Sequence, residues 1–502
     1  MAKAIMVQGT ASNAGKSVIA AALCRIFKQD GYRAAPFKAQ NMALNSYITK
    51  DGLEMGRAQV MQAEAAGIEP DVRMNPILLK PTSDVGSQVI VNGIVLGNRS
   101  AKEYWGQKKA LRPAVQQAYD SLAAEYDIIV IEGAGSPAEI NLKQDDLVNM
   151  GMAKLAHAAV LLVGDIDRGG VFASLYGTVK LLEPDEQNLI CGLIINKFRG
   201  DLEILRPGLE QLEALTGKPV LGVVPYHTLD LDEEDSLSER LEHRALRQAG
   251  IQIAVVRLPH LSNFTDFRAL EGMQGVGVRY VTAPEQLIGA DLIVLPGTKS
   301  TMDDLRWLRT CGLEAQIVRL HQAGIPVLGI CGGYQMMGQT LSDPDGVESG
   351  GTMAGIGILP TETVFRAVKT TTQAVGQILE PAGIFAALAG ARTTGYEIHM
   401  GETVLQAGAQ PFQTLKRGAD TLFDGCVYGN ACGTYLHGIL DTPEVLEPLV
   451  GALMERKGLD PCAIKAFDPA AYKEEQYDRL ADLVRGALDM PALYRILEEN
   501  HA

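Results

Sequence analysis

One short segment of the sequence, Gly329-Ile330-Cys331-Gly332-Gly333, carries a strong structural requirement. It ends an apolar run, residues 325–330, that is typical of a buried strand, and it precedes residues 334–339, which favour a helix start. A strand, a cysteine and a helix joined by glycines predict a nucleophile elbow in which sulfur replaces the usual serine oxygen. Glycines are expected there because the turn is strained and neighbouring backbone passes close to it.

The predicted elbow makes Cys331 a candidate nucleophile. A thiol at a helix N-terminus is favoured as the thiolate, and the amide of Gly332 would point into the site as an oxyanion donor. A second amide is expected from Gly297, in the turn that follows the strand candidate Leu292–Leu295. A buried structural cysteine is the alternative interpretation of this local pattern.

A thiolate nucleophile needs a base, and two histidines are candidates. His437 follows the strand candidate Val427–Gly433, and α/β folds bring strand ends together. His399, in the segment 395–401, is the main rival. We prefer His437, which with Cys331 would attack an unactivated amide, form a thioester and release the amine.

Apolar runs that alternate with helical stretches predict an α/β chain of two domains. The strand candidates of the first half are Ala4–Val7, Ala34–Phe37, Ile128–Ile131, Val160–Val163, Gly192–Ile195 and Val220–Val224. Those of the second half are Ile251–Val256, Leu292–Leu295, Val327–Ile330, Gly355–Leu359 and Val427–Gly433. We expect a P-loop parallel sheet at 1–228, an acidic connection at 229–250, a second α/β domain at 251–445 and a helical extension at 446–502. In that extension a helix packed on the core is predicted by the spacing of Leu480, Leu483, Val484 and Leu488.

The first strand candidate leads into a glycine-rich loop and then into a predicted helix at 18–28. Backbone amides of such a loop cradle phosphate oxygens, its lysine reaches the β- and γ-phosphates, and its hydroxyl ligates magnesium. The residues expected in these roles are Gly9, Thr10, Gly15, Lys16 and Ser17. Five residues, not the usual four, separate the two glycines, and this longer loop resembles that of dethiobiotin-synthetase-like enzymes, which phosphorylate carboxylates. We therefore predict ATP and Mg²⁺ as cofactors.

Polar side chains also follow other strand candidates, at the edge where open α/β sheets bind ligands. Glu132 ends one strand and could hold magnesium, which takes one or two protein ligands. Asn196 ends another and is placed to contact a purine, while Asp165 and Asp167 follow a third, with helix capping as their alternative. Candidate partners of substrate carboxylates or phosphates, with surface charge as the alternative, are Lys38, Lys80, Lys197 and Arg199.

Composition excludes several classes of protein. The net charge of −15 argues against non-specific nucleic-acid binding. Seven cysteines without a CxxC pair predict neither a disulfide framework nor a zinc site and favour a reducing compartment. We find no signal-peptide pattern and no apolar run near the roughly 18 residues of a membrane span. We expect a cytoplasmic protein with small-molecule substrates and without nucleic-acid or membrane partners, and the sequence sets no oligomeric state.

Several segments resemble known families. Residues 329–335 and 435–438 resemble a class I glutamine amidotransferase domain, in particular the branch found in corrin-amidating enzymes. Most class I domains carry a glutamate two residues past the histidine. Here that position, 439, is isoleucine, so the resemblance does not indicate which group orients His437. Nearly the whole chain is similar to the cobyric acid synthase family through the segments 8–12, 36–45, 74–82, 132–139, 194–200, 258–266 and 396–401.

This resemblance implies a glutamine-hydrolysing carbon–nitrogen ligase of cobalamin biosynthesis. The family uses ATP, magnesium and glutamine to amidate the b, d, e and g side-chain carboxylates of (adenosyl)cobyrinic acid a,c-diamide, giving (adenosyl)cobyric acid. A P-loop half would make an acyl phosphate, and a class I amidotransferase-like half would supply ammonia. The resemblance also suggests Asn196 as an adenine contact and Asp146 as an acid/base or metal-organising carboxylate. Helix capping is an equal alternative for Asp146.

Two other functions were weighed. A cobyrinic acid a,c-diamide synthase would share the chemistry but act on other carboxylates, and the extended segments 38–45 and 74–82 favour the four-amide enzyme. A partition-type ATPase switch fused to an inactive amidotransferase-like domain would be a regulatory module. The presence of both Cys331 and His437 speaks against that second alternative.

Overall fold

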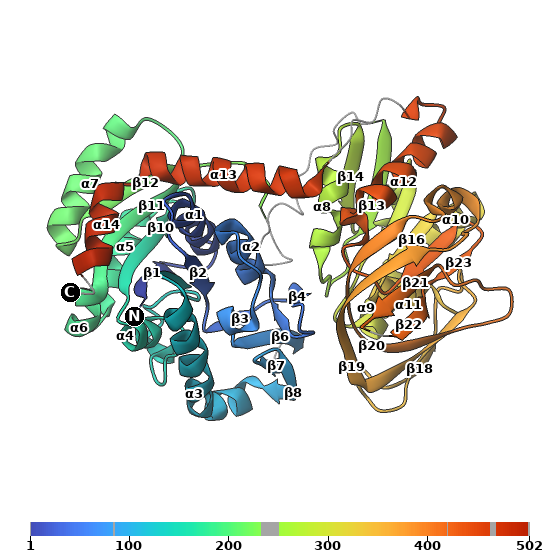
Figure 1. The fold of residues 1–502 in the computed structure, drawn as a ribbon, viewed down its shortest axis with the longest axis horizontal. Coiled ribbons are helices and arrows are strands. Elements are labelled where there is room, and N and C mark those ends of the chain that lie inside the picture. The colour runs from blue at the N-terminus through green and yellow to red at the C-terminus, as the bar shows by residue number, and fades with distance from the viewer. Residues whose placement is uncertain (1, 84–85, 232–249, 419, 462–467, 500–502) are drawn as a thin grey trace. The chain divides into compact units, whose positions relative to one another are not determined.

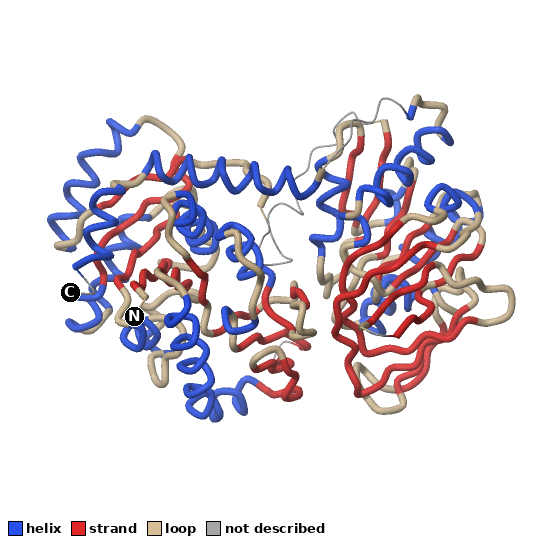
Figure 2. The backbone as a smooth tube through the Cα atoms, viewed as in Figure 1, coloured by secondary structure: helices blue, strands red, loops and turns tan. Residues whose placement is uncertain are grey.

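The computed structural model describes the chain apart from residues 1, 84–85, 232–249, 419, 462–467 and 500–502. It divides into two compact units (Figures 1 and 2). Unit 1 comprises Met1–Ala43, Glu54–Glu234 and Ala471–Ala502, and unit 2 comprises Leu44–Leu53 and Asp235–Ala470. The predicted acidic connection at 229–250 lies mostly outside the described residues. No helix in the described ranges is long and apolar enough to span a membrane.

Unit 1 is built on a six-stranded sheet in the order β12-β11-β10-β1-β9-β2, with all neighbours parallel. Its strands are β1 (Lys3–Gly9), β2 (Ala34–Phe37), β9 (Ile128–Glu132), β10 (Ala159–Asp165), β11 (Ile190–Phe198) and β12 (Val220–Pro225). The helices are α1 (Lys16–Gln29), α2 (Arg57–Ala66), α3 (Ala101–Glu125), α4 (Met150–Ala156), α5 (Val171–Leu181), α6 (Pro184–Leu189), α7 (Leu202–Thr216), α13 (Pro469–Ala487) and α14 (Met490–Glu499). Side chains 4–7 of β1 are fully buried, as expected of a strand covered on both faces.

A second, smaller sheet of unit 1 has the order β3-β6-β7-β8. Its strands are β3 (Gln40–Met42), β6 (Ile77–Ser83), β7 (Gly86–Val91) and β8 (Ile94–Ser100), and β5 (Glu54–Gly56) lies before α2. In this sheet β3 runs parallel to β6, with Asn41 opposite Leu78. Two segments that resemble the family, 36–45 and 74–82, therefore lie side by side.

The C-terminal helices α13 and α14 complete the core of unit 1. Leu480 and Val484 of α13 are fully buried in one cluster with residues of α1, which confirms the predicted helix. The buried guanidinium of Arg25 on α1 also binds two carboxylates of α13, Glu474 at 2.8 Å and Asp478 at 2.7 Å. Residues from the two ends of the chain thus share one core.

Unit 2 contains a six-stranded sheet in the order β14-β13-β15-β16-β24-β23. The first five strands are parallel, and β23 is antiparallel at the edge. These strands are β13 (Ile251–Val256), β14 (Val276–Val281), β15 (Leu292–Leu295), β16 (Val327–Ile330), β23 (Cys426–Tyr428) and β24 (Ala431–Thr434). The helices of the unit are α8 (Arg268–Gly272), α9 (Thr301–Thr310), α10 (Leu313–Gln322), α11 (Gly332–Met337) and α12 (Pro443–Arg456).

A second sheet of unit 2 is mainly antiparallel, in the order β18-β17-β19-β21-β22, with β20 paired to β19. Its strands are β17 (Thr340–Asp343), β18 (Gly351–Ala354), β19 (Thr361–Ile378), β20 (Arg392–Leu405), β21 (Gln413–Arg417) and β22 (Asp420–Asp424). The long strands β19 and β20 are drawn in brown and tan tones beside α11 in Figure 1. Strand β4 (Ser46–Ile48) contacts both of them.

The predicted α/β fold is confirmed, but two of the strands predicted in unit 2 differ from the structure. Gly355–Leu359 is not a strand, and that prediction was wrong. Instead, Ile356 N and Ile358 N donate to the carbonyls of Met336 and Met337, so the segment packs against the end of α11. The predicted strand Val427–Gly433 is a hairpin of β23 and β24.

Candidate active sites

Cys331 lies in a strained turn between β16 and α11. Its backbone has φ 52° and ψ −112°, a conformation that non-glycine residues rarely adopt and that a nucleophile elbow requires. Close packing holds the turn, because a Cβ at Gly333 would lie 2.0 Å from the carbonyl oxygen of Leu295. The geometry is that of the elbow expected from the sequence.

His437 follows β24 and pairs with both Cys331 and an aspartate. Its Nδ1 lies 2.7 Å from Oδ2 of Asp266, and both side chains are almost fully buried. The second oxygen of Asp266 accepts a hydrogen bond from the amide of Gly438 at 3.0 Å. Asp266 therefore occupies the orienting role left vacant by Ile439.

Charge and hydrogen bonding set the protonation state of this pair. Burial opposes the charged imidazolium, but the charge of Asp266 and hydrogen bonds to Asp266 and Cys331 outweigh it and raise the pKa of His437 to about 10. The folded site therefore holds His437 in its protonated form beside Cys331.

The two glycines expected to form an oxyanion site lie close together. A Cβ at Gly332 would be 3.2 Å from the backbone nitrogen of Thr298, the residue after Gly297. A Cβ at Gly297 would be 2.9 Å from Cε1 of His437. Gly297 thus borders the His437 ring, Gly332 directly follows Cys331, and both positions need a residue without a side chain.

A second histidine–aspartate pair holds the loop that contains Gly297. Nδ1 of His260 lies 2.7 Å from the buried carboxylate of Asp304, and the hydroxyl of Thr298 donates to this carboxylate and to the carbonyl of His260. The hydrogen bond and charge of Asp304 raise the pKa of His260. These contacts fix the turn on which Gly297 lies.

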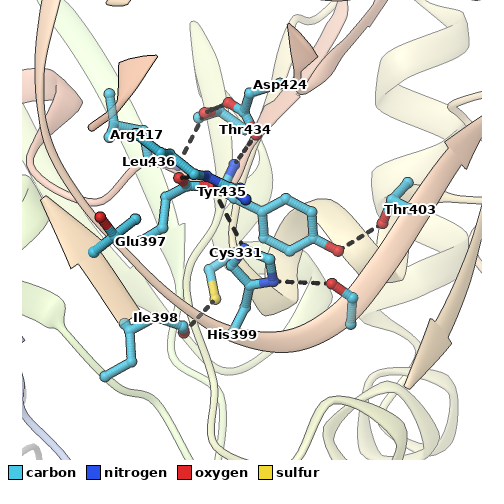
Figure 3. Close-up of polar contacts among 12 residues, drawn as sticks. Cys331, Glu397, Ile398, His399, Thr403, Arg417, Asp424, Thr434, Tyr435 and Leu436 are labelled. Carbon is cyan, nitrogen blue, oxygen red and sulfur yellow. Dashed lines mark hydrogen bonds and ion pairs between the residues drawn. The ribbon is translucent and has the colours of Figure 1, made fainter. Parts of the chain in front are cut away.

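The rival histidine, His399, has a different environment, shown in Figure 3. Its Nδ1 lies 2.9 Å from the carbonyl of Gly401, and its ring stacks on Tyr435 with centroids 3.7 Å apart. Its Nε2 lies 3.5 Å from Glu397, close enough for an ion pair but not oriented as a hydrogen bond. The thiol of Cys331 donates to the carbonyl of Ile398 at 3.6 Å, between these residues in sequence.

Two buried carboxylates stabilise the strands around the cysteine (Figure 3). Glu397 is fully buried and binds Arg417 with both oxygens. Although burial opposes its charge, the interactions with His399 and Arg417 lower its pKa. Asp424 accepts hydrogen bonds from Thr434 and from the amide of Tyr435, and burial raises its pKa. Both carboxylates support the backbone that leads to His437.

The glycine-rich loop of unit 1 joins β1 to α1 as expected. Gly15 has φ 96° and forms the N-cap of α1, and the amide of Thr10 donates to the carbonyl of Val163. Nζ of Lys16 donates to the carbonyls of Ala11 at 2.9 Å and Gly135 at 3.2 Å. The loop and its lysine are therefore folded over the carboxyl edge of the sheet, where a phosphate would bind.

Ser17 and Glu132 converge at this edge. The hydroxyl of Ser17 donates to Oε1 of Glu132 at 2.8 Å, and the buried Nζ of Lys38 binds the same oxygen at 2.9 Å. Nε2 of Gln62 donates to the other oxygen at 2.5 Å. A hydroxyl and a carboxylate at contact distance fit magnesium, which keeps most of its waters. The described residues contain no group of three or more histidine, cysteine, aspartate or glutamate side chains that could hold a metal ion.

Asn196 packs directly on the glycine-rich loop. Its Nδ2 donates to the carbonyl of Ala14 at 3.0 Å, and a Cβ at Gly15 would lie 2.1 Å from the same atom. Its Oδ1 is buried without a hydrogen-bond partner among the described residues. That free acceptor beside the loop is compatible with an adenine amino group.

The other predicted residues form hydrogen bonds or ion pairs within unit 1. The carboxylate of Asp146 accepts from the amides of residues 148, 149 and 151 at the start of α4, which is the helix-capping alternative. The remaining candidate cations each bind a carboxylate, in the pairs Lys80–Glu54, Lys197–Asp165 and Arg199–Asp167. Sequence reasoning missed Asp266, for which the only signal was its place in a segment that resembles the family.

Comparison with known proteins agrees with both sites. Residues 252–445 match the model of the CobB/CobQ-like glutamine amidotransferase domain, and residues 5–238 match that of the CobQ/CobB/MinD/ParA nucleotide binding domain. The chain is 56% identical over 504 residues to a cobyric acid synthase of Ruminiclostridium cellulolyticum, covering 100% of this chain and 98% of the relative. It is 54% identical to those of Lachnoclostridium phytofermentans, over 100% of both chains, and Citrobacter koseri, over 100% of this chain and 99% of the relative.

These matches span essentially the whole chain, and each domain model falls on one of the two sites described above. Unit 1 carries the nucleotide-binding domain, and unit 2 carries the glutamine amidotransferase domain. The chain belongs to the cobyric acid synthase family, the glutamine-hydrolysing carbon–nitrogen ligases of cobalamin biosynthesis.

Proposed function

We propose that the chain amidates the b, d, e and g side-chain carboxylates of (adenosyl)cobyrinic acid a,c-diamide with ammonia taken from glutamine. Identity above 50% over the full length of the cobyric acid synthases carries this proposal. The pairing of an elbow cysteine in one unit with a phosphate-binding loop in the other supports it chemically.

Glutamine hydrolysis is assigned to Cys331, His437 and Asp266. The thiolate attacks the side-chain amide carbon of glutamine, while amides at Gly332 and Gly297 stabilise the oxyanion. His437 gives its proton to the departing nitrogen, so the C–N bond breaks and ammonia leaves. Water, deprotonated by His437, then attacks the thioester and releases glutamate and the thiolate, which restores the starting state of both residues. Asp266 keeps the ring oriented and compensates its charge throughout.

Carboxylate activation is assigned to the loop of unit 1. Amides from Gly9 to Ser17 and the Nζ of Lys16 would hold the ATP phosphates while the γ-phosphoryl group moves to a corrin carboxylate oxygen. Mg²⁺, held by Ser17 and Glu132, would neutralise charge on the phosphates. Ammonia then attacks the acyl phosphate carbon, and phosphate leaves with the C–O bonding electrons. Lys38 is placed to balance the charge of Glu132 between turnovers.

Nitrogen-15 transfer tests the proposal. With amide-labelled glutamine, ATP, magnesium and the a,c-diamide, we expect label in the amides of the product by mass spectrometry. Cys331→Ala should lose glutamine-supported amidation but keep the reaction supported by ammonium chloride. Cys311→Ala, a change at a partly buried cysteine at the C-terminal end of α9, is the matched control. Amidation with glutamine in Cys331→Ala would exclude the assignment.

Substrate competition separates the two corrin alternatives. Purified enzyme should amidate cobyrinic acid a,c-diamide and leave cobyrinic acid unchanged. Consumption of cobyrinic acid to its a,c-diamide would instead identify an a,c-diamide synthase.

A further inference from the structure

A short segment, residues 44–53, lies against β20. Residues of β20 contact the cysteine and the histidine of the proposed glutaminase site. The segment leaves unit 1 after Ala43 and returns to it at Glu54, but its own contacts place it in unit 2. At the return point, the buried carboxylate of Glu54 binds Lys80 at 2.9 Å. The segment is therefore part of the glutaminase unit although both of its ends are anchored in the nucleotide-binding unit.

The segment meets β20 mainly at Tyr396. Tyr47 packs edge-on against the Tyr396 ring, with centroids 5.3 Å apart. The Tyr396 hydroxyl donates to the carbonyl of Ser46 at 3.3 Å, and Gln373 of β19 donates to the carbonyl of Ile48. Ile48, Tyr396 and Ile398 form one buried apolar cluster.

Tyr396 in turn contacts the catalytic histidine. The two rings stack with centroids 5.4 Å apart and an interplanar angle of 18°. Each residue donates its backbone amide to the other's carbonyl, at 3.1 Å and 2.9 Å. Gly395 makes this approach possible, because a Cβ there would lie 2.0 Å from the carbonyl oxygen of His437.

The same tyrosine reaches the aspartate side of the site. Nδ2 of Asn263 donates to the Tyr396 hydroxyl at 2.9 Å, and the amide of Asp266 donates to the carbonyl of Asn263. Two positions further along β20, Ile398 accepts the thiol hydrogen bond of Cys331 with its carbonyl and packs on Ile48 with its side chain. Segment 44–53 thus supports the residues next to all three members of the glutaminase site.

We propose that Tyr396 is a positioning residue for His437 and that segment 44–53 holds Tyr396 in place through Ser46 and Tyr47. Tyr396 takes no part in proton transfer, since His437 pairs with Cys331 and Asp266 through its nitrogens and offers Tyr396 only a ring face. Glutamine hydrolysis in unit 2 then depends on a piece of chain whose ends are fixed in unit 1. This inference rests on the proposed roles of Cys331 and His437.

Substitutions on both sides of the contact test the proposal. Tyr47→Leu removes the edge contact but leaves the site residues intact, and we expect kcat for glutamine hydrolysis to fall about tenfold with KM nearly unchanged, since a misplacement of about 1 Å can cost ~10²-fold. Tyr396→Leu should lose at least as much, whereas Tyr396→Phe keeps the stacked ring and should retain most of the rate. Tyr428→Leu, at an exposed tyrosine of the same unit, is the matched control.

Ammonia-supported amidation distinguishes positioning from general damage. It should equal the wild-type rate in every tyrosine variant, because it bypasses Cys331 and His437. Wild-type glutaminase kcat in Tyr47→Leu and Tyr396→Leu would overturn the inference, as would parallel loss of both activities. Failure of the proposed function would look different, because Cys331→Ala itself would then still hydrolyse glutamine.

Discussion

At the scale of single residues, Asp266 is the group that orients His437 in the proposed glutaminase site. Its carboxylate binds Nδ1 of His437 with one oxygen and the next backbone amide with the other, so it fixes both the ring and the chain beside it. An aspartate that orients a histidine recurs in unrelated hydrolases, where it also sets the tautomer. In this chain the residue comes from a segment 171 positions before the histidine.

Asp266→Asn should lower kcat for glutamine hydrolysis by about 10²-fold or more, because the amide neither compensates the imidazolium nor guarantees the correct tautomer. Ammonia-supported amidation should be unchanged. Release of glutamate from glutamine is the measurement, and Asp420→Asn, at an exposed carboxylate of β22, is the control. An unchanged glutaminase rate would remove Asp266 from the site.

The raised pKa of His437 gives a stability prediction with a definite sign. The folded protein holds this proton up to a pKa of about 10, whereas an unperturbed histidine has 6.5. The stabilisation linked to this proton is complete below about pH 6.5 and is lost as the pH rises towards 10. In calorimetry, the Tm of wild type relative to His437→Gln should therefore fall across this range. A constant difference would contradict the ion pair, and the transition of unit 1 serves as internal control.

These residues also show what the sequence could and could not predict. Cys331, Lys16 and Ser17 could be predicted because strand, turn and helix follow each other within a few positions. His437 could be predicted because it follows a strand, and α/β folds bring strand ends together. Asp266 could not, because its role depends on two loops that meet only in the folded chain. For Asp146, the sequence did not favour helix capping over an acid/base or metal-organising role. The structure adds three backbone amides that donate to its carboxylate, as in helix capping.

At the scale of elements, the elbow depends on how closely α11 approaches β15. Gly333 faces backbone, since a Cβ would meet the carbonyls of Leu295 at 2.0 Å and Pro296 at 2.7 Å. Backbone cannot rotate away as a side chain can, so the turn that carries Gly297 would have to move with any substitution. The two halves of the oxyanion site are thus coupled through packing.

Gly333→Ala should lower the stability of unit 2 by about 1–3 kcal/mol, as overpacking does, and reduce glutaminase activity at the same time. Gly486→Ala is the matched control in helix α13, where a Cβ meets nothing within 4 Å. That substitution should leave the activity unchanged and add about 0.5–1 kcal/mol of stability. Thermal unfolding and glutamate release together check the pair; equal behaviour of both variants would refute the packing argument.

Elements were predictable where hydrophobic runs are long and buried. Except for β14, which was not predicted, the strands of both parallel sheets follow such runs, and their positions agree with the sequence to within a few residues. Gly355–Leu359 is also apolar, but its backbone bonds to α11, and Gly357 has φ 78°, which lies outside the extended conformation of a regular strand. The pair β19 and β20 was missed because threonine, glutamine and charged residues interrupt its apolar positions, as is usual where one face meets solvent.

At the scale of the whole molecule, each unit has its own hydrophobic core. The hydrophobic cluster of unit 2 is formed by buried side chains from between residues 251 and 453. The cluster of unit 1 combines buried side chains from between residues 5 and 231 with others from between residues 477 and 497. Separate cores predict separate unfolding transitions, so a single unfolding free energy would not describe this protein.

Two ligands should move these transitions independently. ATP with magnesium at about 100 times its Kd should stabilise unit 1 by about 2.7 kcal/mol. A chloroketone analogue of glutamine, which alkylates the elbow cysteine, should raise only the transition of unit 2 and should have no effect on Cys331→Ala. Calorimetry of the full chain checks both, and one transition that responds equally to both ligands would show that the cores are not independent.

The return of α13 and α14 to the core of unit 1 bears on how the chain matures on the ribosome. Domains generally fold in the order of synthesis, yet the buried face formed by Leu480, Val484 and Leu493 is translated after the rest of that core and after unit 2. Until those helices emerge, the nascent nucleotide-binding half exposes an apolar surface, while the glutaminase half already has its full set of strands. We expect chaperones that hold unfinished chains to engage this protein until α13 and α14 have emerged.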